Sequence, residues 1–556
     1  MCVKNLFSIL LLNLFCITAA FSQAIGISGV ADRSAYNNQV SFLITNNAGF
    51  TYGATLDGNS VPVGTAVLVN RIDYHELFVW RTNTSTLATS NRLVRFVVTT
   101  PGRDCCEWGL PPWTPYPFIN SAAGEFAGAN LRLLTPQDYP AGMDIPLIAW
   151  VEDNAGHAVR VNGQLTSTNE QVVLIRRGVG SGLLKPASAG PLNYSPQLSS
   201  LAANKVINIE SSTTWTSVSG NLSGSTTWPD DSRISVTGNV TIPAGSSLTV
   251  GAGSVVRLAS KANINLAGSI TVNGTSAKPV VWTPFTATQP WGGIMMSNTA
   301  QVIATGTIWT GGGGEGCFYS GGGAACGTSV DGGSHRPEQA LFHFAAAGSL
   351  TLSNCAAISL AGQFGHFNNG GNMNLNHVLI QRCTSGGQYS VGSIVMNDCA
   401  IIEVPSDTDT FVDGDNDGMY LENGGYSFTN CLVGWTKDDG FDSGGGGGGI
   451  NNFINCWFES TYHEGVSGSG DNKYNNMKDT VVMNCGQAFE DGYSRVTNAA
   501  NNCLYVGNVT GARFGDNYSS GYVYTGFLSV SNSYLLYNYR NVWGMTFNLS
   551  GTGVDA

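Results

Sequence analysis

Acidic residues return at intervals in the second half of the chain, and carboxylates placed in this way could do chemistry. In chain order they are Asp413, Asp415, Asp417, Asp438, Asp439, Asp442, Glu464 and Glu490. Asp439 follows Asp417 by 22 residues, and Glu464 follows Asp439 by 25. Glycoside hydrolases use a pair of carboxyl groups, one to protonate the leaving oxygen and one to activate water or attack the sugar. The spacing therefore predicts glycosidic bond cleavage, provided that the fold brings these motifs to one surface.

A second regularity shows how such motifs could meet. When the motifs are aligned on Gly418, Gly440, Gly465, Ala488 and Ala512, two columns of residues appear. The first is apolar and is predicted to point inward: Met419, Phe441, Val466 and Phe489. The second lies beside a turn and is mostly acidic: Asp417, Asp439, Glu464 and Gln487. Tyr420, Asp442, Ser467 and Glu490 are predicted to face solvent, because side chains alternate along a strand.

The elements that must position these residues are indicated by a dipeptide that recurs inside short apolar runs. Its clear instances are Asn354-Cys355, Asp398-Cys399, Asn430-Cys431, Asn455-Cys456, Asn484-Cys485 and Asn502-Cys503, with Asn376-His377 and Asn532-Ser533 in the same frame. Asn adopts the left-handed backbone conformation at little cost and suits a tight turn. The pattern predicts a solenoid of β coils, with an Asn ladder at the turns and the Cys side chains stacked in the core.

This pattern resembles the right-handed parallel β-helix of the pectate-lyase-like superfamily. The preceding segment Ile234–Thr283, rich in Val, Ile, Thr and Gly, is similar to the opening coils of large secreted bacterial β-helix proteins. The resemblance covers residues 232–556 and implies an all-β fold. Because that fold supports lyases, hydrolases, adhesins and inert stalks, it does not identify the function.

The order of the motifs resembles that of polygalacturonase-type glycoside hydrolases. The resemblance implies that Asp417, Asp438 and Asp439 supply the acid and the bases, that His463 supports them with Glu464 beside it, and that substrate is bound by Asp442, Glu490, Arg495 and Arg513. Three features depart from the family pattern. Asn416 is adjacent to Asp417, Glu464 replaces a Gly after the His, and no Lys follows Arg495 to grip a uronate carboxylate.

A metal site is a further expectation. Asp413, Asp415 and Asp417, followed by Gly418, match the first half of a calcium loop, but position 12 is Gly424 rather than Glu. The acidic cluster is similar to those of calcium-assisted polysaccharide lyases, in which an Arg or Lys acts as the base. The candidates for this base are Arg495, Arg513 and Lys473. The alternative is a solvated acidic rim, or calcium that only fastens the coils.

The chain divides into several segments. Residues 1–22 have a basic Lys4, an apolar run and small residues before Gln23, which predicts a signal peptide. Residues 23–100 and 101–185 read as immunoglobulin-like β-sandwich modules, residues 186–231 as a linker and residues 232–556 as the β-helix, which we expect to continue beyond Ala556. No later segment reaches the ~20 apolar residues of a membrane span. The protein is thus predicted to be secreted or attached to the cell surface.

Composition limits the partners. The net charge of −12 gives no reason to expect nucleic acid. Removal of Cys2 and Cys16 with the signal leaves an odd number of cysteines, so at least one thiol must be free. We expect a polysaccharide or cell-surface glycan as the partner. The alternative to a hydrolase or lyase is a noncatalytic adhesive or glycan-binding β-helix, for which the glycan is only a bound ligand.

Overall fold

The structure is a computed structural model in which almost every element is a β-strand. It describes residues 25–32, 34–71, 73–99, 120–167, 172–185, 188–297, 299–314, 340–367, 370–404, 417–436, 438–443, 449–468, 473–491, 497–514, 527–538, 540–543, 546–550 and 553–554. None of the helices in these ranges is long and apolar enough to cross a membrane.

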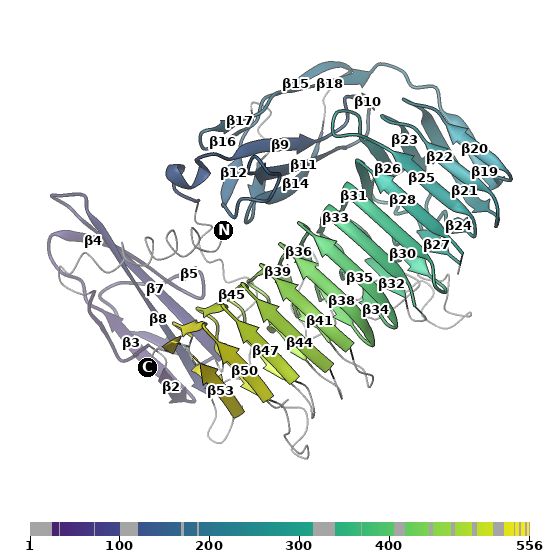
Figure 1. The fold of residues 1–556 in the computed structure, drawn as a ribbon. Coiled ribbons are helices and arrows are strands. Elements are labelled where there is room, and N and C mark those ends of the chain that lie inside the picture. Colours follow the sequence, from purple (N-terminus) through teal and green to yellow (C-terminus); the bar gives the residue numbers. More distant parts are fainter. Residues whose placement is uncertain are drawn as a thin grey trace.

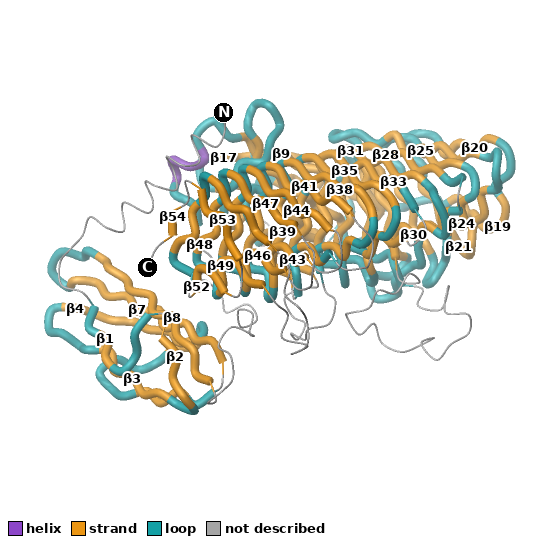
Figure 2. Tube along the Cα trace, turned by 60° about the horizontal axis from the view of Figure 1, so that its bottom comes forward, coloured by secondary structure: helices purple, strands orange, loops and turns teal. Residues whose placement is uncertain are grey.

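The first described segment is a two-sheet sandwich. One sheet has the order β1 (Ile27–Ser28), β3 (Val40–Ile44), β6 (Val67–Val69), and the other has the order β2 (Ser34–Asn37), β8 (Thr89–Thr99), β7 (Asp73–Asn83), β4 (Phe50–Leu56), β5 (Asn59–Ser60). Alternate residues of β3 are buried, and Phe42 and Phe96 meet in the shared core. Figures 1 and 2 both show this sandwich beside the C-terminal coils.

Residues 120–210 form a second unit, which we call the covering module. Its elements are η1 (Ala123–Phe126), β9 (Asn130–Leu134), β10 (Asp138–Pro140), β11 (Ile145–Glu152), β12 (Gly163–Leu165), β13 (Val173–Ile175), β14 (Val179–Leu184), β15 (Gly190–Tyr194), β16 (Gln197–Leu198), β17 (Leu201–Ala202) and β18 (Lys205–Glu210). The main sheets are β14-β11-β9 and β10-β18-β15. Residues 186–231, expected to be a linker, therefore carry strands instead, because apolar residues such as Ile207 and Ile209 alternate along β18 and are buried.

The rest of the chain is a parallel β-helix (Figures 1 and 2). From β19 (Thr216–Asn221) onward, most strands pair in parallel with the strand three places later, so each coil has three faces. The all-β solenoid predicted from the repeats is thus confirmed. It begins at β19, ahead of the expected residue 232.

The three faces are named here by what they carry. The ladder face contains β20 (Ser225–Trp228), β22 (Ser247–Val250), β25 (Ser269–Asn273), β28 (Gln301–Thr305), the first halves of β31 (Ser349–Ile358) and β33 (Asn372–Gln381), β35 (Gly392–Asn397), β38 (Gly424–Thr429), β41 (Gly449–Ile454), β44 (Lys473–Lys478), β47 (Thr497–Asn501), β50 (Phe527–Ser531) and β53 (Thr546–Ser550). The docking face contains the first half of β21 (Arg233–Ile242), β23 (Val255–Leu258), β26 (Val280–Pro284), β29 (Thr307–Thr310), the second halves of β31 and β33, β36 (Ala400–Val404), β39 (Leu432–Thr436), β42 (Trp457–Glu459), β45 (Val481–Met483), β48 (Leu504–Val506), β51 (Tyr534–Leu536) and β54 (Gly553–Val554).

The site face contains the second half of β21, β24 (Ile264–Leu266), β27 (Ile294–Met296), β30 (Ala340–Phe344), β32 (Gln363–Phe367), β34 (Gln388–Tyr389), β37 (Met419–Leu421), β40 (Phe441–Asp442), β43 (Glu464–Gly468), β46 (Gln487–Asp491), β49 (Thr510–Phe514) and β52 (Arg540–Trp543). The acidic motifs of the sequence lie on or just before its later strands.

The repeated dipeptides lie at the corners of the coils. Between the ladder and docking faces, the corner residue of successive coils has a positive φ: Asn354, His377, Asp398, Asn430, Asn455, Asp479, Asn502 and Asn532. The Asn455 side chain donates a hydrogen bond to Asn430, and Asn502 donates one to Asp479, as an Asn ladder predicts. Because Asn and Asp tolerate this conformation, one such residue per coil turns the chain with little strain.

Two of the predicted repeats belong elsewhere. Asn484-Cys485 lies at the next corner, between the docking and site faces, and the first corner of that coil is Asp479-Thr480. Asn376 is paired one position before the corner, which is made by His377. The misplacement of Asn484 is explained by a second left-handed corner in the same coil, which accepts the same residue types as the first.

The cysteines of the repeats are core residues. Cys355, Cys399, Cys431, Cys456, Cys485 and Cys503 are buried free thiols that contribute to the main core. Each Sγ contacts a backbone carbonyl oxygen of its own coil, such as Ser353 for Cys355. Their burial as small apolar side chains agrees with the structural interpretation of the pattern, although Cys485 lies at a different corner from the other five.

The docking face carries apolar side chains toward the lumen and also on its outer surface, because the covering module lies over that surface. Residues that point away from the lumen, such as Leu379, Leu432 and Trp457, share one core with Ile148 and Val179 of the module. Figure 1 shows the module along the edge of the solenoid. Burial of this apolar surface contributes about 25 cal/mol per Å² to the association of the two units.

Buried ion pairs cross the same interface. Arg176 of the module donates to Glu403 at 2.8 Å, and Arg382 of the solenoid lies 3.0 Å from the other oxygen of that carboxylate. Arg177 pairs with Glu459 at 2.5 Å and lies over the ring of Trp457. Although burial by itself raises it, the pKa of Glu403 is lowered below its ordinary value by Arg382 and Arg176.

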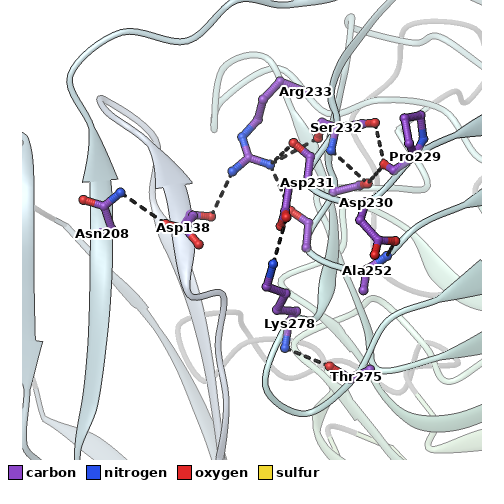
Figure 3. Close-up of polar contacts among 12 residues, drawn as sticks. Asp138, Asn208, Pro229, Asp230, Asp231, Ser232, Arg233, Ala252, Thr275 and Lys278 are labelled. Atoms are coloured by element: carbon purple, nitrogen blue, oxygen red, sulfur yellow. Dashed lines mark hydrogen bonds and ion pairs between the residues drawn. The ribbon is translucent and has the colours of Figure 1, made fainter.

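A further polar cluster joins the module to the first coils (Figure 3). Arg233 donates to the backbone oxygens of Asp138 and Asp231 and forms an ion pair with Glu210. Lys278 holds Asp231 at 2.8 Å. The module is therefore fastened at its junction with the solenoid as well as along the docking face.

We predict that Glu403→Gln destabilises the protein by about 3–5 kcal/mol, because two guanidinium groups would lose their buried counter-charge. Urea unfolding followed by circular dichroism measures this. Asp231→Asn is the matched control: it removes an exposed pair with Lys278 and should change stability little. Equal effects of the two substitutions would contradict the proposed role of the buried carboxylate.

Candidate active site

The predicted columns of acidic and apolar residues are formed by the register of the site face. Met419 pairs with Phe441, Phe441 with Val466, and Val466 with Phe489, and all four side chains are buried. Glu464 pairs with Gln487 in the same ladder. The alignment on Gly418, Gly440, Gly465 and Ala488 is thus confirmed by the strand pairing. In the last coil it is wrong by one residue, because Ala512 pairs with Phe489 and not with Ala488.

The column beside the turn is a chain of hydrogen bonds between coils. The backbone N–H of Asp439 donates to Oδ1 of Asp417 at 3.3 Å, and the N–H of Glu464 donates to Oδ1 of Asp439 at 2.9 Å. The Gln487 amide donates to Oε1 of Glu464. These side chains are nearly inaccessible to solvent, with Asp417 only 2% exposed. Each carboxyl group therefore helps to hold the next coil in place.

Asp439 and Glu464 share a hydrogen bond between their side chains. Burial, the charge of Glu464 and this hydrogen bond raise the pKa of Asp439 well above its ordinary value, and Asp438 and Asp442 act in the same direction. Burial and Glu490 raise the pKa of Glu464 as well, against the opposite effects of Asp439 and Arg513. Two such neighbouring carboxyl groups cannot both ionise readily, so ionisation of the pair is disfavoured.

Asp438 and His463 stand next to this pair. Nδ1 of His463 lies 3.1 Å from Oδ1 of Asp438, and the ring of Tyr462 stacks on the imidazole with centroids 4.9 Å apart. One ligand atom from each of Asp438, Asp439 and His463 lies within 4.8 Å of the others. The three groups thus converge, although only Asp438 and Asp439 are next to each other in sequence.

The other predicted residues are placed as follows. Asp442 is half-buried, and Glu490 and Arg513 are register partners whose side chains approach to 3.7 Å. Glu490 and Arg513 are 8% and 4% exposed, which is less than a solvent-facing position predicts. Lys473 begins β44 on the ladder face. Asp413, Asp415 and Arg495 lie outside the described residues.

The outward column of the site face also runs back toward the first coils, beyond the predicted acidic motifs. Asp442 pairs with Tyr420, Tyr420 with Gln388, Gln388 with His366 and His366 with His343. The two imidazole rings stack with centroids 5.6 Å apart, and burial lowers the pKa of His343 to about 4. No spacing signal marks His343, because it stands alone between two phenylalanines.

Asp491, at the end of β46, is fully buried and lies close to Asn498 on the next strand. Burial and the neighbouring Glu490 raise its pKa to about 9, while Asn498 acts in the opposite direction. The carboxyl group is therefore neutral at neutral pH in the folded protein. It ionises near pH 4 in the unfolded chain.

We predict that the parent protein loses stability as pH rises from about 4 to about 9, and that the Asp491→Asn variant does not show this loss. In that window the folded state binds the proton and the unfolded state does not, so the free energy of unfolding falls by up to about 1.4 kcal/mol per pH unit. Urea unfolding at pH 5, 7 and 9 measures it. A difference between variant and parent that does not change with pH would contradict the raised pKa.

Comparison with known proteins gives little information about the function of this site. No protein-family model matches the chain, and no curated protein matches its sequence. Among solved structures, the periplasmic alginate epimerase AlgG is similar at 8% identity, over 59% of this chain and 78% of its own, with a TM-score of 0.32. An alginate lyase from Paenibacillus sp. is similar at 11% identity, over 55% of this chain and 93% of its own, with a TM-score of 0.23.

The catalytic domain of a GH87 α-1,3-glucanase is similar at 11% identity, over 80% of this chain and 96% of its own, with a TM-score of 0.26. Likenesses this distant carry no information on the reaction. Any reaction must therefore be argued from the site itself.

Proposed function

We propose that this protein hydrolyses glycosidic bonds of an uncharged polysaccharide at the site face. The observation that carries the proposal is the buried Asp439–Glu464 pair beside Asp438 and His463, in which burial and the neighbouring charges raise both pKa values. A carboxyl group whose pKa is raised by burial and by a neighbouring carboxylate is what a general acid requires at neutral pH.

The separation of the carboxyl groups supports a retaining reaction. The oxygens of Asp438 and Asp439 lie within 4.8 Å, close to the ~5 Å of retaining enzymes and short of the ~6.5–9.5 Å of inverting enzymes. In this scheme Asp439 gives its proton to the leaving oxygen while Asp438 attacks the anomeric carbon. Water then cleaves the glycosyl ester, with Asp439 taking the proton from that water.

His463 and Tyr462 act on Asp438 in this scheme. The imidazole lies 3.1 Å from one oxygen of Asp438 and orients this carboxylate for attack. Stacking on Tyr462 holds the ring in its orientation. His463 is therefore a positioning residue, and Glu464 positions the proton on Asp439.

The charges of the site favour an uncharged substrate. Asp417, Asp438, Asp439, Asp442, Glu464 and Glu490 face a single described arginine, Arg513, which is close to Glu490. A uronate polymer would be repelled unless a cation neutralised this cluster. Cleavage of a uronate by a calcium-assisted lyase mechanism is therefore the less favoured alternative.

Calcium remains part of that alternative. The expected ligands are Asp413, Asp415 and Asp417, of which only Asp417 is among the described residues. The convergent set Asp438, Asp439 and His463 suits calcium poorly, because calcium prefers oxygen ligands alone and an imidazole suits a transition metal better. The scheme above therefore needs no metal ion.

A second candidate is a noncatalytic glycan-binding protein. Its support is that Asp417 and Asp439 accept backbone hydrogen bonds from the next coil, which is a structural role. In either case, export by the predicted signal peptide of residues 1–22 would bring the protein to extracellular or cell-surface polysaccharides.

We predict that Asp438→Asn and Asp439→Asn each lower cleavage about 10²–10⁴-fold, since each removes one of the two carboxyl groups that the reaction needs. The assay follows reducing ends and ultraviolet absorbance on neutral and acidic polysaccharides, with and without calcium. Absorbance from an unsaturated product would instead indicate a lyase.

Asp479→Asn is the control, because this carboxylate lies at a coil corner away from the site face. Circular dichroism checks that each variant is folded. If the folded parent protein cleaves no substrate but retains a glycan, the hydrolase proposal is wrong and the glycan-binding function is favoured.

We also predict that azide restores cleavage to Asp438→Ala but not to Asp439→Ala on an ordinary glycoside. Azide can take the place of a missing nucleophile but cannot protonate the leaving oxygen. Proton NMR of the glycosyl azide and of the first sugar released by the parent measures the stereochemistry. An inverted anomer from the parent protein would contradict the retaining assignment.

A further inference from the structure

The ladder face carries almost no charge, although the chain has 25 Lys and Arg and 37 Asp and Glu residues. Its central outward position forms one register column from Thr227 to Ser529 without a charged residue. The middle of this column is Thr271, Ile303, Thr351, Asn374, Val395 and Ser427. The side chains of this column are exposed or half-buried.

The two flanking columns have the same character. One begins at Ser225 and the other at Asn273, and both consist mainly of Ser, Thr, Asn and Gln. Among the described residues of the three columns, Lys478 is the one charged residue. Figure 1 shows this face toward the viewer, with the covering module on another side. The acidic residues of the chain are concentrated elsewhere, so this face needs its own explanation.

Hydrogen bonds between coils order the polar side chains of the face. The Ser393 hydroxyl donates to Asn372 at 2.7 Å, and the Asn476 amide donates to Asn452 at 3.2 Å. Side chains held in this way lose little conformational entropy on binding. They repeat about every 4.8 Å along the solenoid axis, because that is the spacing of paired strands.

We propose that the ladder face binds the surface of a solid, uncharged polysaccharide. A charged polymer would find almost no counter-charge here, whereas packed sugar chains present repeating hydroxyl groups to hydroxyl and amide partners. Ile303, Val395 and Ile450 are 38%, 41% and 53% exposed and supply apolar contact for the C–H faces of sugar rings. The rigid sheet matches a periodic solid better than a flexible single chain.

This binding goes beyond the proposed cleavage and does not require it. The ladder and site faces are different sides of the same coils, joined by short connections such as that between β37 and β38. A protein attached to a solid by the ladder face would hold the site face next to the same material. Retention on a solid and cleavage of a soluble chain are therefore separable measurements.

The test is retention of the full chain on microcrystalline cellulose, insoluble α-1,3-glucan and chitin, measured by depletion from solution. The variant Thr351→Lys/Asn374→Glu/Val395→Lys places charges of alternating sign on adjacent coils, so that they pair instead of repelling one another. Because these charges would have to be desolvated on binding, we expect retention of the variant to fall about tenfold or more.

The matched control, Thr51→Lys/Asn59→Glu/Ser60→Lys, carries the same charges on exposed residues of the N-terminal sandwich and should be retained like the parent. Asp439→Asn should also be retained, so a failure of cleavage is distinguished from a failure of binding. The proposal would be overturned if the parent bound none of the three solids, or if the ladder-face variant were retained as well as the parent.

Discussion

The structure depends on the in-register, parallel stacking of coils. Most strands of the solenoid form backbone hydrogen bonds with the strand three places later, so a residue type that recurs in the sequence becomes a column in space. Left-handed corner residues such as Asn430 and Asn455 keep the register, because the turn must occur at the same point of each coil. A slip by one residue would move every lumen side chain to the outside.

The same stacking explains the properties of the candidate site. Coils about 4.8 Å apart place successive carboxyl groups within hydrogen-bond reach, and their burial prevents water from screening the charges. Ionisation of Asp439 and Glu464 is therefore disfavoured, and Asp491 keeps its proton at neutral pH. A structural column of carboxyl groups and a proton donor for glycoside cleavage are thus the same arrangement, and the activity assay separates the two roles.

The covering module adds a constraint that no solenoid alone would have. Docking-face strands are buried on both sides, since one side lines the lumen and the other lies under the module. Arg176 and Arg177 cross this interface to Glu403 and Glu459, where loss of a partner would leave a buried charge. The described outward residues of the ladder face are instead exposed or half-buried, and they are mostly polar and nearly all uncharged.

Local patterns in the sequence were sufficient for the fold class, the corner residues and the columns around Phe441 and Glu464. These follow from the two-residue period of strands and from the backbone preference of Asn, both of which act over a few residues. The sequence did not reveal that Asn484 turns a second corner, that residues 186–231 form strands, or that His343 joins the same column as Asp442. Nor did it show that Glu403 lies between two arginines, and the proximity of Asp438 to His463 followed only from the resemblance to polygalacturonase-type hydrolases. Those contacts join residues far apart in the chain, and only the packing of coils and module brings them together.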